Sequence, residues 1–182
     1  MVLMTGSAGA AAAEEDSGST DRLVGLLIER LDTADTVAAI KWAAAVRDGG
    51  EPMIDDPARE AAIYDAMTAL GGEHQLPAAW VRNVFEGQIE ANKMVQRGLV
   101  AEWRSQVVTA PVSATDLAGI RPVIDRANVG IVDELSARRG ELASGDCPAR
   151  VTGSVLAVAG ARHVDLLHQA ALVRAALPLC EA

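Results

Sequence analysis

The chain is poor in aromatic residues, which make up 3% of its 182 residues, although hydrophobic residues make up 50%. Alanine and leucine supply most of the apolar content. Sheet-rich domains depend on aromatic and β-branched side chains, so this composition favours helices over strands. The sequence also lacks a run of 18 or more apolar residues, and we therefore expect no membrane-spanning segment.

Positive charge is scarce as well. The net charge is −9, and no basic stripe is present that could neutralise a phosphate backbone. We therefore expect no nucleic acid as the main partner. A small anionic ligand stays possible, because it needs only a local cluster of cations.

The usual signatures of covalent, phosphate-binding and metal-dependent enzymes are missing. His163 and His168 are five residues apart, a poor spacing for one helix face, and no pattern of cysteine or carboxylate ligands surrounds them. We interpret both histidines as packing or surface residues. The sequence thus predicts neither a metal nor a cofactor.

The chain has two cysteines, Cys147 and Cys180, and their state depends on the compartment. In a reducing compartment they would be small buried thiols. In an exported protein they would form a disulfide that closes a loop of about 34 residues and stabilises the fold by about 3–4 kcal/mol. Ala11 to Ala13, just before Glu14, resemble a signal-peptide cleavage site. The basic region of a signal peptide is absent, however, so residues 1–20 are either its remnant or a flexible leader.

Helical periodicity dominates the rest of the chain. The clearest case is Asp21 to Trp42, where apolar residues recur at steps of three and four. Further helices are predicted over residues 59–70, 77–106, 115–142 and 149–180, with Gly71 and Gly72 ending the second and a break near Gly153 or Gly160 in the last. Pro122 marks a kink or the true start of the fourth. The fold class is therefore all-α, a bundle of about five to six helices with one long N-terminal helix.

Polar residues interrupt these apolar helices at several points. Arg30 and Lys41 are 11 residues apart, which places them on nearly the same side of the first helix, about 16 Å apart along its axis. A buried cation is costly unless an anion meets it, so either carboxylates of another helix or an anionic ligand must lie beside them.

Other polar residues occur at the starts and along the faces of the later helices: Asp56, Arg59, Glu60, Asn92, Gln96 and Arg121. Taken singly, each has an ordinary explanation as a helix cap or a surface residue. Taken together, cations and amides that converge within a bundle would bind a small polyanion with hydroxyl or ether oxygens.

Three segments in order carry a family resemblance: LIERLDTADTVAAIKW, then DPARE, then VFEGQIEANKMVQ. They resemble the all-helical class of chorismate mutases. The segment from Asp116 to Arg121, followed by Cys147 and Cys180, is similar to the exported bacterial (gamma-type) subclass. The resemblance covers residues 21–180, and no single motif in it is as specific as the ordered combination.

The resemblance implies an isomerase that converts chorismate, the small-molecule substrate, to prephenate on the route to phenylalanine and tyrosine. The reaction is an intramolecular Claisen rearrangement without a covalent intermediate, a proton transfer or a cofactor. The protein must hold the dianionic substrate in its reactive conformer and stabilise charge on the ether oxygen as the C–O bond breaks.

Four residues would act on the carboxylates and the breaking bond. The resemblance implies that Arg30 and Arg121 grip the two carboxylates as bidentate donors. Lys41 would bind a carboxylate and the ether oxygen, and Gln96 would donate a second hydrogen bond to that oxygen. Some family members carry a carboxylic acid at the position of Gln96 and must keep it protonated.

Four more residues would complete the binding site. Glu60, with Asp56 nearby, would accept a hydrogen bond from the ring hydroxyl. Asn92 would help to hold a carboxylate, and Arg59 would complete the cationic lining.

The resemblance also implies the organisation of the protein. Residues 21–182 would form one domain, in which helices of residues 21–106 form the core of the mutase and residues 112–182 complete the site. The subclass implies a paired Cys147 and Cys180, secretion to the periplasm or the exterior rather than a cytoplasmic location, and a homodimer with a complete site in each chain. The alternative is a non-catalytic helical module that binds a small dicarboxylate, or an exported interaction domain.

Overall fold

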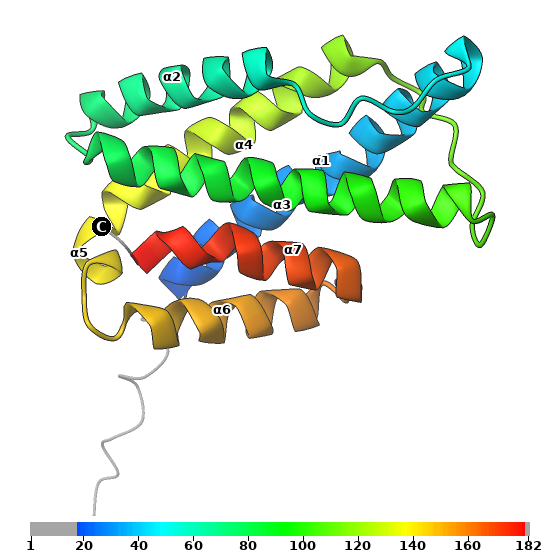
Figure 1. Cartoon of the computed structure of the whole chain (residues 1–182). Helices are drawn as coiled ribbons and strands as arrows, with labels where there is room; N and C mark the ends of the chain where they lie inside the picture. Colours follow the sequence, from blue (N-terminus) through cyan, green and yellow to red (C-terminus); the bar gives the residue numbers. More distant parts are fainter. Residues whose placement is uncertain (1–17, 181–182) are drawn as a thin grey trace, which may run out of the picture.

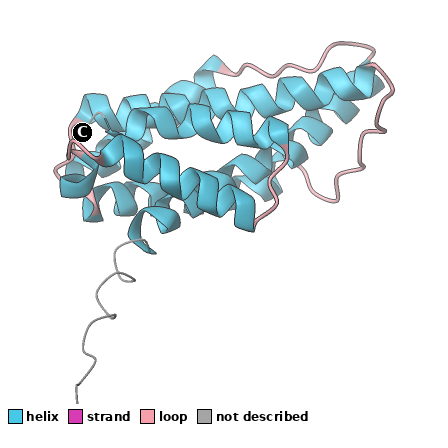
Figure 2. Cartoon of the chain, turned by 90° about the horizontal axis from the view of Figure 1, so that it is seen from below, coloured by secondary structure: helices cyan, strands magenta, loops and turns pink. Residues whose placement is uncertain are grey.

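The computed structural model describes residues 18–180, which form seven α-helices and a final 3₁₀ turn without any strand (Figures 1 and 2). The prediction of an all-α bundle is confirmed. Most of the predicted leader, residues 1–17, lies outside the described residues. Gly18 to Thr20 were assigned to that leader and instead begin the first helix. Within residues 18–180, none of the helices combines the length and the apolarity that a bilayer crossing requires.

Helix α1 (Gly18–Asp48) is the central element of the bundle. It packs most extensively against α3 (Ala78–Arg104) and α4 (Leu117–Ala137), and it lies behind α3 in Figure 1. Most of the predicted apolar stripe is buried, whereas Leu26 and Trp42 are only half-buried. The helix runs six residues beyond Trp42, because alanines follow and favour helix, and it ends before Gly49, which has a φ of +70°.

Helix α2 (Pro57–Glu73) begins as predicted, since the side chain of Asp56 accepts a hydrogen bond from the backbone N–H of Arg59 at 3.1 Å. It does not stop at Gly71 and Gly72. Gly71 is buried, and a Cβ there would lie 2.7 Å from a methyl group of Val81 on α3. This glycine therefore allows two helices to approach closely instead of ending one of them.

Helix α4 follows a long loop and is capped by Asp116, whose carboxylate accepts from the N–H of Gly119 at 2.8 Å. Pro122 lies inside α4 and neither begins nor ends it. The predicted fourth helix is divided, because α5 (Arg139–Leu142) is separate from α4.

The last predicted stretch is also divided, into α6 (Cys147–Ala161), α7 (Leu166–Ala176) and the 3₁₀ turn η1 (Leu177–Cys180). Gly153 stays helical, and the break comes just after Gly160. Cys147 and Cys180 form a disulfide that joins the start of α6 to the end of η1. Of the two states left open by the sequence, the structure contains the one expected of an exported protein.

The two histidines that were considered for zinc binding have the packing and surface positions expected of them. His163 is exposed, whereas His168 on α7 is buried. Its Nδ1 lies 2.7 Å from a carboxylate oxygen of Asp165, and its Nε2 lies 3.0 Å from one of Asp35 on α1. The hydrogen bond to Asp35 outweighs the effect of burial and raises the pKa of His168 from 6.5 to about 9. An imidazolium therefore joins α7 to α1.

This ion pair predicts a loss of stability at alkaline pH. The pKa of His168 is higher in the folded state, so its stabilising effect is complete below pH 6.5 and disappears as the pH rises to about 9. Because Asp35 and Asp165 are more than half exposed, we expect a loss on the order of 2 kcal/mol in the free energy of unfolding. Urea titrations at pH 6 and pH 9 measure it. His168→Gln should be less stable at pH 6 and should lack most of this pH dependence; an equal loss in both proteins would contradict the assignment.

Candidate active site

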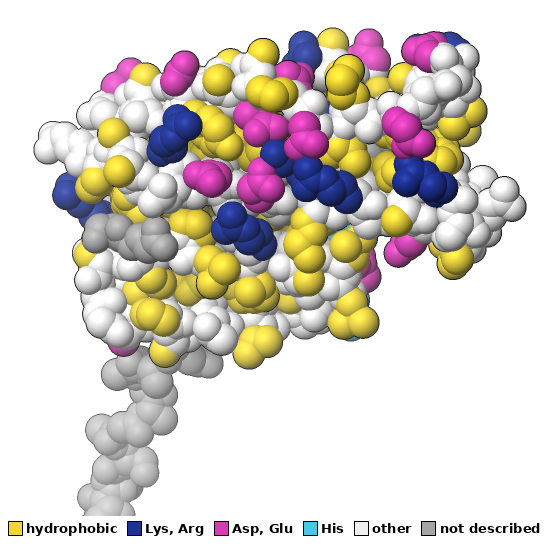
Figure 3. All heavy atoms as spheres, in the orientation of Figure 1, with side chains coloured by type: hydrophobic (Ala, Val, Ile, Leu, Met, Phe, Trp, Pro, Cys, Tyr) yellow, Lys and Arg dark blue, Asp and Glu magenta, His cyan; other side chains and the backbone are white. Residues whose placement is uncertain are grey.

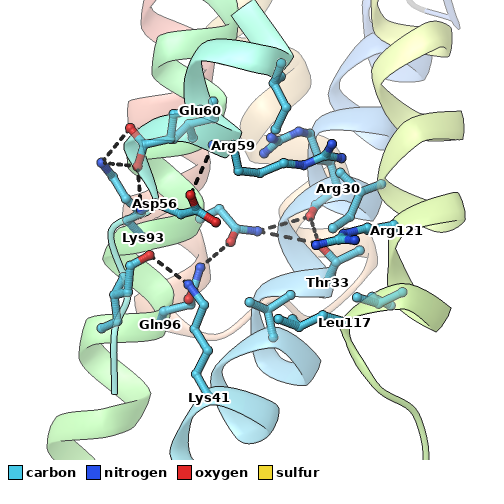
Figure 4. A pocket seen from close by; sticks show the side chains of 17 residues that line it. Arg30, Thr33, Lys41, Asp56, Arg59, Glu60, Lys93, Gln96, Leu117 and Arg121 are labelled. Atoms are coloured by element: carbon cyan, nitrogen blue, oxygen red, sulfur yellow. Dashed lines mark hydrogen bonds and ion pairs between the residues drawn. The ribbon is translucent and has the colours of Figure 1, made fainter. Parts of the chain in front are cut away.

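One pocket lies where α1, α2, α3 and α4 converge (Figure 4). All eight residues that the sequence singled out line it: Arg30, Lys41, Asp56, Arg59, Glu60, Asn92, Gln96 and Arg121. Four separate segments supply them, so the fold brings together residues that are up to 91 positions apart, from Arg30 to Arg121. Their chemical roles stay predictions at this point.

Arg30 is the most deeply buried of the cations, with 4% of its surface exposed. Its Nε donates to Oδ1 of Asn128 at 2.7 Å, and its Nη1 donates to the backbone carbonyl of Gln88 at 2.9 Å. Both acceptors are neutral, and no carboxylate of residues 18–180 forms an ion pair with this guanidinium. Burial accordingly lowers the pKa of Arg30 to about 10. The charge is thus held in place without being neutralised.

Lys41 is half-buried at the other end of the same helix face. Its Nζ donates to the backbone carbonyl of Ile54 at 2.7 Å, which is again a neutral acceptor. Burial lowers its pKa, while the more distant carboxylates of Asp56 and Asp55 act in the opposite direction. The sequence predicted that these two cations would need carboxylates or a ligand; within the described residues, the partners are only amide and carbonyl oxygens.

An amide pair from α3, Asn92 and Gln96, lines the pocket together with these cations. Nε2 of Gln96 donates to Oδ1 of Asn92 at 2.7 Å, and Nδ2 of Asn92 donates to the backbone carbonyl of Arg30 at 3.4 Å. Oε1 of Gln96 is buried and finds no hydrogen-bond partner among residues 18–180. A buried polar atom that lines a pocket in this way calls for a donor from the pocket, or for rotation of the amide.

The start of α2 supplies both carboxylates of the pocket and one further cation. The carboxylate of Glu60 accepts from Nζ of Lys93 at 3.2 and 3.3 Å. Arg59 is half-exposed and forms an ion pair with Asp125 of α4 at 3.3 Å. Asp56 caps α2 through one oxygen and lines the pocket.

Arg121 differs from the other cations of the pocket. It is exposed on α4 and has neither a hydrogen bond nor an ion pair with any residue that the structure describes. Its guanidinium is therefore available to an anion that enters the pocket.

Sequence reasoning missed three residues that shape the site: Lys93, Asn128 and Asp125. Lys93 lies in the pocket one residue after Asn92 and three before Gln96, so the helical face that indicated the amide pair could also have indicated it. Asn128 and Asp125 act through contacts to Arg30 and Arg59, and no local pattern marks such partners.

The lining carries five cationic side chains against two carboxylates, although the whole chain has a net charge of −9. Such a local excess of positive charge attracts a small anion electrostatically. No element of the pocket presents a serine or cysteine nucleophile. The arrangement is chemically suited to binding and polarising an anionic ligand.

Known proteins share both the sequence and the fold. Residues 19–97 match the sequence model of the family described as "Chorismate mutase type II". A protein of Mycolicibacterium smegmatis named "Secreted chorismate mutase" is 36% identical over 93% of this chain and 90% of its own length. The chain belongs to the chorismate mutase family.

Further relatives agree with this assignment. A "Secreted chorismate mutase" of Mycobacterium tuberculosis is 28% identical over 88% of this chain and 77% of its own. The crystal structure of a chorismate mutase from Burkholderia phymatum superimposes with a TM-score of 0.80 at 36% identity, over 90% of this chain and 97% of that one. A chorismate mutase from Burkholderia thailandensis gives a TM-score of 0.81 at 28% identity, over 89% and 99%. The similarity extends beyond the matched segment to the helices that follow it, so the second half of the chain is part of the family's fold.

Proposed function

We propose that this chorismate mutase converts chorismate to prephenate in the pocket between α1, α2, α3 and α4. The observation that carries the proposal is the pair Arg30 and Lys41, two cations held by neutral acceptors on one helix face, with an amide pair that lines the same pocket. Chorismate supplies what this arrangement lacks, namely two carboxylates and an ether oxygen on which charge develops.

Within this proposal, the carboxylates bind at the two arginines. Arg30 is fixed by Asn128 and Gln88 and offers its remaining N–H groups to one carboxylate. Arg121 has its donors free for the other. This binding holds the enolpyruvyl side chain over the ring, so that the carbon atoms that will be joined come close together.

Lys41 and Gln96 act at the bond that breaks. As the C–O bond lengthens and the new C–C bond forms, negative charge builds up on the ether oxygen, and the ammonium and an amide N–H stabilise it. The backbone carbonyl of Ile54 holds the ammonium, and Asn92 holds the amide. Both donors are therefore oriented before the substrate arrives.

The start of α2 completes the proposed site. Glu60, with Asp56 nearby, accepts the hydrogen bond of the ring hydroxyl, and Arg59 adds positive charge at the side held by Asp125. Asn92 helps to bind a carboxylate. No step moves a proton or forms a covalent bond to the protein, and the pocket lining contains neither serine nor cysteine.

The proposed location follows the same relatives. Both curated relatives are named as secreted, and the disulfide of this chain fits export. We propose a homodimer in which each subunit has its own site, as the resemblance to the exported subclass implies; all eight predicted residues of one chain line the same pocket.

The decisive experiment is the loss of chorismate's ultraviolet absorbance on addition of the protein. We expect first-order loss that depends on enzyme concentration, with prephenate as the product. A non-catalytic binding module would instead bind a bicyclic transition-state analogue tightly without turnover. An interaction domain would show neither behaviour.

The two cations on α1 should differ in their kinetic effects. Lys41→Ala removes a donor to the breaking bond and should lower kcat by about 10²–10³-fold. Arg30→Lys keeps a charge at the carboxylate and should mainly raise KM, with a smaller change in kcat. Steady-state kinetics of both variants test the assignment. A Lys41→Ala enzyme that kept most of its kcat would leave α1 with a structural role only.

The amide of Gln96 predicts a particular pH profile. Gln96 needs no proton to donate, so kcat/KM should change less than about threefold between pH 5 and pH 8. Because burial lowers the pKa of Lys41 from 10.5, activity should begin to fall on the alkaline side below that pH. Gln96→Glu is the matched variant: it donates only when protonated and should lose activity steadily from pH 5 to pH 8. The same steep loss in the wild-type enzyme would refute the role of Gln96.

Mixing two inactive variants tests whether each subunit has a complete site. Chains that carry Arg30→Ala and chains that carry Arg121→Ala should not restore activity when they are unfolded together and refolded. Recovery of about a quarter of the wild-type activity would mean that the partner supplies one of the arginines, because half of the dimers in a random mixture are mixed and one of the two sites in each mixed dimer would combine the two intact arginines.

A further inference from the structure

A buried lysine, Lys93, lies at the edge of the pocket and has no part in the mechanism described so far. It is on α3, next to Asn92 and one helical turn before Gln96, and only 9% of its surface is exposed. Figure 4 shows its side chain directed toward Glu60 rather than toward the middle of the pocket. A lysine in such a position is unusual, because burial of an ammonium is costly unless anions surround it.

Three carboxylates surround this ammonium. Nζ of Lys93 lies 3.2 Å from Oε1 of Glu60, 3.2 Å from Oδ1 of Asp55 and 2.5 Å from Oε1 of Glu90. In Figure 3, acidic and basic side chains gather over α2 and α3, the elements that supply this cluster. Burial lowers the pKa of Lys93, but the hydrogen bonds to these carboxylates outweigh it and raise the pKa above its usual value. The ammonium stays charged at every pH at which the enzyme would act.

The first consequence concerns Glu60. Lys93 contacts both oxygens of its carboxylate, at 3.2 and 3.3 Å, and Oε1 also accepts from the backbone N–H of Asp56 at 3.3 Å. Without the ammonium, the carboxylates of Glu60, Asp55 and Glu90 would face one another and repel. Lys93 thus fixes the direction in which Glu60 presents its remaining lone pairs to the pocket.

The second consequence concerns Lys41. Asp55, which Lys93 holds, directly follows Ile54, whose carbonyl orients the ammonium of Lys41 at 2.7 Å. Asp55 also precedes Asp56, the cap of α2. Lys93 therefore anchors the loop that positions Lys41. Arg97, one turn further along α3, holds Asp55 from the exposed side at 2.8 Å and does not line the pocket.

We propose that Lys93 is a positioning residue of the mutase, which orients Glu60 toward the ring hydroxyl of the substrate and, through Asp55 and Ile54, orients Lys41 toward the ether oxygen. The inference rests on the proposed function, since it needs Glu60 and Lys41 in the roles given above. In this proposal Lys93 does not touch the substrate and acts only through Glu60 and Lys41. Its side chain thereby connects the residue at the ring hydroxyl with the residue at the ether oxygen.

The test compares Lys93→Met with Arg97→Met, two variants on one helix that each remove a cation from Asp55. Lys93→Met should lower kcat/KM for chorismate by about 10²-fold, with KM raised through Glu60 and kcat lowered through Lys41. Arg97→Met leaves Glu60 and Asp55 in contact with Lys93, so it should lose much less activity than Lys93→Met, and only in kcat. Lys93→Arg keeps the charge and the bridge and should recover most of the loss. Circular dichroism and thermal melts identify variants that fail to fold. If Lys93→Met fails to fold, Lys93→Gln replaces it, because glutamine is closer to lysine in polarity.

A chorismate analogue without the ring hydroxyl separates positioning from general damage. With this substrate the contribution of Glu60 is absent, so Lys93→Met should lose about tenfold less, relative to wild type, than it loses with chorismate. The smaller loss that remains should appear in kcat, because it comes from Lys41. Asp55→Asn releases the loop of Ile54 and Asp55 from Lys93 but keeps the ion pair between Lys93 and Glu60. Its loss of kcat/KM should therefore be the same with both substrates.

Two results would overturn the proposal: a folded Lys93→Met or Lys93→Gln enzyme within twofold of wild type on chorismate, or equal losses with both substrates. Glu60→Ala separates this failure from a failure of the proposed function. If Glu60→Ala loses activity with chorismate but much less with the analogue, the role of Glu60 stands and only the inference about Lys93 fails. If the wild-type protein does not turn over chorismate, the proposed function itself fails.

Discussion

The structure depends above all on one uncompensated charge, the guanidinium of Arg30 in the interior of a helical bundle. Removing a charge from water costs several kcal/mol, and the two neutral oxygens that meet Arg30 offset only part of that cost. The part of this desolvation cost that is not offset favours the binding of an anion beside the guanidinium. Because α1 lies at the centre of the bundle, the surrounding helices keep the guanidinium of Arg30 in a fixed position. An anionic ligand that pairs with it gains affinity, because the binding group is already oriented.

The second half of the chain has a direct part in that arrangement. Helix α4 carries Asn128, which orients Arg30, together with Arg121 and Asp125, which face the same pocket or its edge. Helix α7 packs against α3, where a Cβ on Gly98 would lie 2.7 Å from a methyl group of Leu167. The disulfide ties η1 to the start of α6. Residues after position 110 therefore line the pocket as well as contributing to the core, and the similarity to solved chorismate mutases covers about nine-tenths of the chain.

In the proposed mechanism, catalysis relies on donors that are oriented in advance. Lys41 is held by a carbonyl, Gln96 by an amide and Glu60 by an ammonium, so each group has a fixed direction before the substrate binds. Preorganisation of this kind is effective because no reorientation is needed when charge develops on the ether oxygen. The proposed role of Lys93 extends this principle beyond the residues that would touch the substrate.

The amino-acid sequence by itself determined the helical class and the long first helix, because helical periodicity is a local property of the chain. It also indicated eight polar residues that line the pocket, through their ordered combination and its resemblance to the chorismate mutases. It misplaced several helix ends. Gly71 and Gly72 were expected to stop α2, but Gly71 serves a close contact with Val81 that depends on another helix. Only the tertiary structure decided which partners the cations have. Asn128 lies 98 residues from Arg30, and Lys93 lies 33 from Glu60, and such pairings arise when helices pack, so no local pattern of the sequence encodes them.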